Sequence, residues 1–177
     1  MTAIFNPRIW RPALDKYGAV THLSVAVYDV HEQIVCGPVP ASPLHTLFTE
    51  FSYAPGLFAA CARQCLAQAD DRPAVIVGHA LGFAVVGTSL LLDGPIVGAA
   101  VAGYALLELP HASTVERLAK DAHVPLGRLW DVARQQQPVP QRRLAMHGEL
   151  LQGLGDTILQ ENARKRQYEE TPAQLVE

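Results

Sequence analysis

The feature that most constrains the fold is a long apolar stretch from Ala74 to Leu107, whose only formal charge is Asp93. Asp93 begins an Asp-Gly-Pro sequence. Asp-Gly between two apolar runs favours a hairpin turn, because glycine readily adopts the positive φ that such turns need. The pattern predicts two strands, residues 83–92 and 96–106, joined at this turn. The run 75–79 predicts a third strand, since Val and Ile favour a pleated, half-buried surface.

A membrane-spanning helix is the alternative interpretation of residues 74–92, which are long and apolar enough for one. Three features argue against it. His79 would lie in the middle of the span, no basic or aromatic anchors flank it, and the next apolar run is too short to return across a bilayer. We therefore expect a sheet and no membrane insertion.

Composition restricts the class of protein. The chain has 177 residues, which suits one domain with an appendage. The net charge is −3 and acidic and basic residues are interspersed, so the sequence shows no basic patch of the kind that binds nucleic acid. The three cysteines, an odd number, fit a reducing compartment better than a disulfide framework. Because the N-terminus also carries no secretory pattern, we expect a cytoplasmic protein.

The segments before the apolar stretch supply two more strands and three helical segments. Residues 1–18 predict an N-terminal docking arm with a short helix, limited by its two prolines. Residues 22–29 and 34–37 predict a second hairpin, so the sheet would have about five strands. Ser42-Pro43 is typical of a capped helix start, and residues 57–69 return to helical spacing. The expected fold is a mixed α/β (α+β) domain over residues 19–140, with an antiparallel sheet covered by helices.

The C-terminal third is predicted to be helical. Ser113 and Glu116 form a capping-box pattern, a second helix would follow Val124-Pro125, and residues 135–140 make a polar linker. A long helix is predicted over 141–168. Five of its positions are spaced alternately by three and four residues and so form one stripe, which favours pairing with a partner helix. These positions are Leu144, His147, Leu151, Leu154 and Ile158. Because the helix becomes charged after residue 159, residues 141–177 are interpreted as a signalling and dimerisation helix with its tail.

The order of these elements, with the turn sequence Leu-Asp-Gly-Pro-Ile-Val-Gly at 92–98, resembles a GAF-type sensory domain with a GAF/PAS-like sheet. The segments HVPLGRL (123–129), QPVPQRRL (137–144) and LLQGLGDTI (150–158) look like the end of PocR-like sensory domains. Those domains precede histidine kinases and other output modules. The resemblance covers residues 20–162. It implies a non-enzymatic input domain of two-component signalling, homodimeric and followed by an output domain.

The resemblance also implies a ligand pocket between the sheet and the helices over it. Such pockets place a few polar groups among many apolar ones, so a small, largely apolar ligand is expected. The candidate lining residues are Phe51, Phe58, Cys61, Cys65, His79, Phe83 and Tyr104. The small residues of 98–103 would either leave room for a ligand or admit a close helix.

A redox or metal sensor is the alternative function. Cys61 and Cys65 lie one helical turn apart, and thiolate with imidazole from His79 would suit zinc, copper or haem iron. PocR-like domains often carry a further cysteine where His79 stands here, so the chain departs from that pattern. Alternatively, the cysteines are simply small apolar residues of the core. A third interpretation of the whole domain is a dimerisation module with a filled core. No nucleophile motif such as Gly-x-Ser-x-Gly occurs, so no enzyme is expected.

Overall fold

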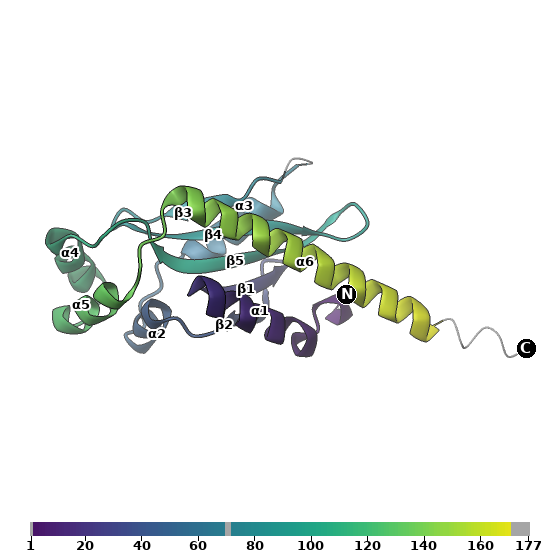
Figure 1. Ribbon diagram of the computed structural model, residues 1–177, viewed down its shortest axis with the longest axis horizontal. Helices are drawn as coiled ribbons and strands as arrows, with labels where there is room; N and C mark the ends of the chain where they lie inside the picture. Colours follow the sequence, from purple (N-terminus) through teal and green to yellow (C-terminus); the bar gives the residue numbers. More distant parts are fainter. Residues whose placement is uncertain (1, 70–71, 171–177) are drawn as a thin grey trace, which may run out of the picture.

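A five-stranded antiparallel sheet forms the centre of the protein, with strand order β2-β1-β5-β4-β3. The computed structural model describes residues 2–69 and 72–170. The strands are β1 (Ser24–Asp29), β2 (Ile34–Val39), β3 (Val75–Gly78), β4 (Phe83–Leu91) and β5 (Ile96–Leu106). Helices cover both faces of the sheet (Figure 1). The mixed α+β fold expected from the sequence is therefore confirmed.

The predicted strands agree closely with the observed ones. The β4–β5 turn is closed by the hydrogen bond from Leu92 N to Pro95 O, and Asp93 and Gly94 both have positive φ. The second hairpin differs in one respect, because β2 continues past Gly37 through Pro38 to Val39. A proline is tolerated there since β2 is an edge strand, where a missing N–H breaks no sheet hydrogen bond.

The helices are α1 (Pro7–Thr21), α2 (Pro43–Glu50), α3 (Leu57–Leu66), α4 (Ala112–Ala122), α5 (Leu126–Gln135) and α6 (Gln141–Glu170), preceded by a short 3-10 helix, η1 (Thr2–Phe5). Ser42 caps α2 as predicted, since its Oγ accepts a hydrogen bond from His45 N at 3.4 Å. The predicted capping box of α4 is wrong. The first turn closes earlier, where Val115 N donates to His111 O, so Ser113 lies inside the helix.

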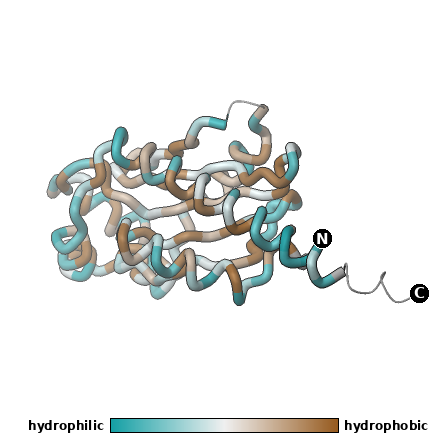
Figure 2. The backbone as a smooth tube through the Cα atoms, turned by 45° about the vertical axis from the view of Figure 1, so that its right-hand side comes forward, coloured by the Kyte–Doolittle hydropathy of each residue, from teal (hydrophilic) through white to brown (hydrophobic). Residues whose placement is uncertain are grey.

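Alternate residues of the strands are buried on opposite faces of the sheet. Phe83 and Val85 face α2, α3, α4 and α5, whereas Ala84 and Val86 face α1 and α6. Figure 2 shows the hydrophobic residues along the strands and hydrophilic ones toward the C-terminal end of α6. Burial on both faces explains why β4 and β5 read as continuous apolar runs rather than as alternating patterns.

Helix α6 lies across the sheet, and this corrects the interpretation of its apolar stripe. Leu144 and Leu151 are fully buried against the sheet of the same chain, and Ile158 is nearly so. His147 and Leu154 lie half-buried beside them. The partner surface for the stripe is therefore the chain's own sheet, and these side chains are not free to pair with a second helix.

Close approach of α6 to the sheet depends on two glycines. A Cβ on Gly148 would lie 2.6 Å from a methyl group of Val86, and one on Gly155 would lie 2.4 Å from a methyl group of Leu90. Because the two glycines are seven residues apart, they lie on the same face of the helix, two turns from each other. They let the helix backbone settle directly onto β4.

A partly buried ion pair ties the middle of α6 to the sheet. Asp156 accepts hydrogen bonds from Arg72 Nη2 at 2.7 Å and from Leu91 N at 3.0 Å. The Arg72 guanidinium also donates to Ser89 O, and Gln152 donates back to Arg72 O. Beyond Asn162, which is still buried, α6 continues past the edge of the sheet (Figure 1), where residues such as Arg164 and Lys165 are exposed.

No helix in the described ranges 2–69 and 72–170 combines the length and the apolar character needed to cross a bilayer.

The burial of α6 is tested by two neighbouring leucines. Leu151 is fully buried and Leu150 is 64% exposed. Leu151→Ala is expected to lower the free energy of unfolding by about 2–5 kcal/mol, because it leaves a cavity against the sheet. Leu150→Ala is the control, with an expected change of about 0.5 kcal/mol or less. Urea unfolding measures both. Equal losses, or a loss that depends on protein concentration, would contradict the packing described here.

Candidate functional site

The candidate site is a cluster of rings between the sheet and helices α2 and α3, which we call the Tyr104 cluster. Its members are His45 and Phe48 of α2, Phe58 of α3, Phe83 of β4 and Tyr104 of β5. The Tyr104 ring centroid lies 5.8 Å from that of His45, 5.2 Å from those of Phe48 and Phe58, and 5.6 Å from that of Phe83. Tyr104 thus contacts every other ring, mostly edge to face, a favourable arrangement of aromatic quadrupoles.

Three residues expected in the pocket, Phe58, Phe83 and Tyr104, belong to this cluster. His79 lies at its edge, where its ring stacks on Phe83 at 4.4 Å and its Nδ1 accepts a hydrogen bond from Leu81 N at 3.1 Å. Phe51 lies outside the cluster, half-buried beneath the guanidinium of Arg128. The structure therefore collects most of the predicted residues on one face of the sheet, packed against one another.

The two cysteines of α3 lie on the same face, over β4. Cys61 and Cys65 are fully buried, and a Cβ on Gly87 would lie 2.5 and 2.8 Å from their Sγ atoms. The Cys61 thiol donates a hydrogen bond to Val75 O. The neighbouring Cys65 thiol and burial raise the pKa of Cys61, so it remains a neutral thiol. A neutral, buried thiol is a poor nucleophile.

The proposed ligand set of Cys61, Cys65 and His79 is not brought together. Cys61 is held at Val75, and His79 is four residues further along the chain, roughly 13 Å away at ~3.3 Å per strand residue. Among the residues that the structure describes, no three His, Cys, Asp or Glu side chains gather closely enough to hold a metal ion.

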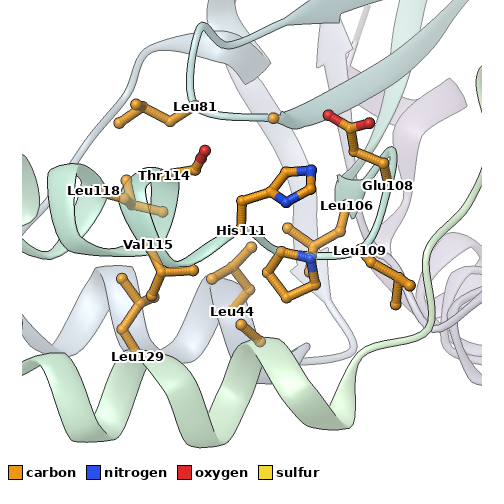
Figure 3. Close-up of a pocket in the computed structure, with 13 residues that line it drawn as sticks. Leu44, Leu81, Leu106, Glu108, Leu109, His111, Thr114, Val115, Leu118 and Leu129 are labelled. Atoms are coloured by element: carbon orange, nitrogen blue, oxygen red, sulfur yellow. The ribbon is translucent and has the colours of Figure 1, made fainter.

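A small cavity adjoins the Tyr104 cluster (Figure 3). It has a volume of about 30 Å³ and lies between α2, the β3–β4 turn, the end of β5 and the pair α4–α5, which we call the α4–α5 lobe. Its wall is mainly apolar, with Leu44, Leu118 and Leu129 among the lining residues. In Figure 3 the His111 ring and the Glu108 carboxylate lie together on one side of this space. The volume suffices for one or two water molecules but not for a metabolite.

His45 and Tyr104, the two titratable members of the cluster, are uncharged near neutral pH. Burial lowers the pKa of the His45 imidazole, and its buried Nδ1 has no hydrogen-bond partner in the described part of the chain. Burial raises the pKa of Tyr104 and of Tyr28 to about 12. The cluster therefore favours a neutral ligand with at most one or two hydrogen-bonding groups.

His45 and the walls of the cavity were missed as site residues from the sequence. A local signal existed for His45, because the Ser42 cap sets the start of α2 and places His45 and Phe48 three residues apart, on one face. No local signal existed for the cavity, because α2, α4 and α5 meet there from distant parts of the chain.

Comparisons with protein-family models, with curated proteins and with solved structures found no match to this chain. The class that can be stated is a mixed α+β domain with helices on both faces of its sheet.

The contact of the cysteines with β4 gives a stability prediction. Gly87→Ala would place a methyl group against both thiols, and overpacking of this kind is expected to cost about 1–3 kcal/mol of unfolding free energy. Gly78→Ala is the matched control, because nothing lies within 4 Å of a Cβ at that position in β3. Thermal or urea unfolding compares them, and equal effects would show that the thiols do not pack on Gly87.

The buried imidazole gives a pH prediction. Burial lowers the pKa of His45 below its usual value of 6.5, so the unfolded chain binds this proton more readily than the folded one. Unfolding free energy is therefore lost as the pH falls through 6.5 toward the folded pKa. His45→Phe removes this contribution, so its stability should vary less between about pH 7 and pH 5. The pKa of His147 is lowered as well, but this residue is present in both the wild type and the variant, so its contribution cancels in the comparison. Identical slopes in urea titrations would exclude the effect.

Proposed function

We propose that this chain is a sensory input domain of a bacterial signalling protein, which binds a small, largely apolar ligand and relays its state through α6. The observation that carries the proposal is the position of α6. Residues up to Asn162 pack against the domain on the face opposite the Tyr104 cluster, and the last turns of α6 extend beyond the sheet (Figure 1). A helix so placed connects a ligand-sensitive core with whatever follows in the chain.

Two hydrogen bonds join β5 to the linker that leads into α6. Gln136 Nε2 donates to Tyr104 O at 2.7 Å, and Val139 N donates to Leu106 O at 2.7 Å. Both donors belong to the short linker between α5 and α6. A change in the position of β5 or of the α4–α5 lobe would therefore reach the first turn of α6 directly.

The α4–α5 lobe is the element that we expect to move. It packs at one end of the sheet (Figure 1), and its ion pair to α2, between Arg128 and Glu50, has both side chains about half exposed. An exposed ion pair contributes little to stability. Movement of the lobe would enlarge the leucine-lined cavity enough for a ligand. Binding would then stabilise the open arrangement by population shift.

The resemblance to GAF-type, PocR-like domains agrees with this proposal. On that basis we expect a cytoplasmic protein, a homodimer, and a downstream output module such as a histidine kinase. Since the Leu144–Ile158 stripe is occupied by the sheet, the dimer contact would use other surfaces.

Ligand binding in the cavity is tested with indole and 1-hexanol as apolar probes. A probe present at about 100 times its Kd should raise the melting temperature by roughly 5–10 °C. Val115→Phe fills the cavity and should abolish the rise, whereas Val20→Phe, at a 79% exposed position of α1, should keep it. Ala133→Val narrows the same cavity and guards against misfolding of the larger variant. The proposal fails if neither probe stabilises the protein, or if both cavity variants respond like the wild type.

A further inference from the structure

Helix α6 carries a second stripe, on the face turned away from the sheet, which we call the outer stripe. It consists of Met146, Leu150, Gly153 and Thr157, which are spaced by four, three and four residues and so lie along one side of the helix. Met146 is 56% exposed and Leu150 is 64% exposed. Figure 1 shows α6 at the front of the molecule, with no other described element over it. Two large apolar side chains of this helix thus lack a partner within the described part of the chain.

Gly153 is not explained by the packing of its own chain. Glycine in the middle of a helix is destabilising relative to alanine. Gly148 and Gly155 compensate by letting α6 approach β4, but Gly153 is exposed, and nothing lies within 4 Å of a Cβ built there. The next residue of the stripe is also small, and the Thr157 hydroxyl is turned back to donate to Gly153 O at 2.8 Å. The outer stripe therefore has large residues in its first half and small ones in its second.

A stripe of this kind is complementary to a reversed copy of itself. A two-fold axis near residue 152 would pack two α6 helices antiparallel, with the same surface used by both copies. Leu150 would then lie over the partner's Gly153. Met146 would lie beside the partner's Thr157. Small residues opposite large ones let two helices approach closely, because each large side chain fills the space that a small one leaves.

The charges beside the stripe favour the antiparallel arrangement. Arg143 and Glu161 are eighteen residues apart, five helical turns, so they lie on the same side of α6. Both are exposed, and neither forms an ion pair with the described residues. In the antiparallel pair Arg143 meets the partner's Glu161, and the symmetry repeats this contact. A parallel pair would instead bring Arg143 beside the partner's Arg142, a like-charge contact.

We propose that the outer stripe of α6 is the contact between two copies of this chain, packed antiparallel about residue 152. The inference rests on the proposed function only for the expectation of a homodimer, and ligand binding in the cavity plays no part in it. Helix α6 would then be enclosed between its own sheet on one face and the partner's α6 on the other. The C-terminal ends of the two helices would lie at opposite ends of the dimer.

Sedimentation equilibrium over a wide range of protein concentrations measures the dimer. Gly153→Gln should weaken it at least tenfold, because the glutamine side chain fills the space of the partner's Leu150, while its helix propensity keeps the protomer folded. Gly127→Gln is the matched control. Gly127 is an exposed glycine in the first turn of α5, with nothing within 4 Å of its Cβ position, so this variant should dimerise like the wild type.

Charge exchange tests the direction of the two helices. Arg143→Glu alone should weaken the dimer about tenfold, because it replaces two attractive contacts with two repulsive ones. Glu161→Arg alone should do the same. The double variant Arg143→Glu/Glu161→Arg restores both contacts with the charges reversed, so its dissociation constant should return close to that of the wild type. In a parallel dimer, Arg143→Glu would tighten the association instead.

Three results would overturn the proposal: a monomer at every concentration, equal dissociation constants for the Gly153→Gln and Gly127→Gln variants, or no recovery in the double charge variant. The thermal response to indole reports on the cavity, which lies on the other side of the sheet, so failure of the dimer is read separately from failure of ligand binding. Each protomer folds by itself. Unfolding measured below the dissociation constant therefore reports on the monomer, and the Leu150→Ala comparison applies at those concentrations.

Discussion

The structure depends on the burial of the β4–β5 hairpin on both faces of the sheet. Neither strand has a solvated side, so each needs a helix layer above and below it. One layer contains α3, α2 and the α4–α5 lobe, and the other contains α1 and α6. Small residues keep these layers close. Gly87 receives the two cysteines of α3 on one face, and Gly148 and Gly155 let α6 approach β4 on the other.

The two faces of the sheet are built differently. On the α2–α3 face, large rings pack around Tyr104, and the remaining space is an apolar cavity at the edge of a lobe. Near the start of α6, the end of α1, the linker after α5 and Arg143 bound an open groove. The short linker after α5 contributes to both regions through Gln136, which touches the backbone of Tyr104 and lines the groove. Any coupling between a ligand and α6 would pass through this linker.

Local patterns predicted most of the helices and strands, but not which surface each face of a helix packs against. The Asp93-Gly94 turn and the Ser42 cap are decided by a few neighbouring residues, so both were predicted correctly. The stripe on α6 was misassigned, because alternating spacings of three and four describe any helix with one buried face, whether it packs on a helix or on a sheet. The cysteine pair was likewise visible in the sequence, but its distance from His79 depends on where α3 lies along β3 and β4.

The amino-acid sequence by itself determined most of the secondary structure, the two hairpins and the fold class. These follow from periodicity, turn chemistry and the need to bury apolar side chains, all of which act over a few residues. Only the tertiary structure decided that α6 packs on its own sheet, that the Tyr104 rings fill the expected pocket, and that a groove forms beside Arg143. Each of these results from contacts between segments far apart in the chain, which no local pattern encodes.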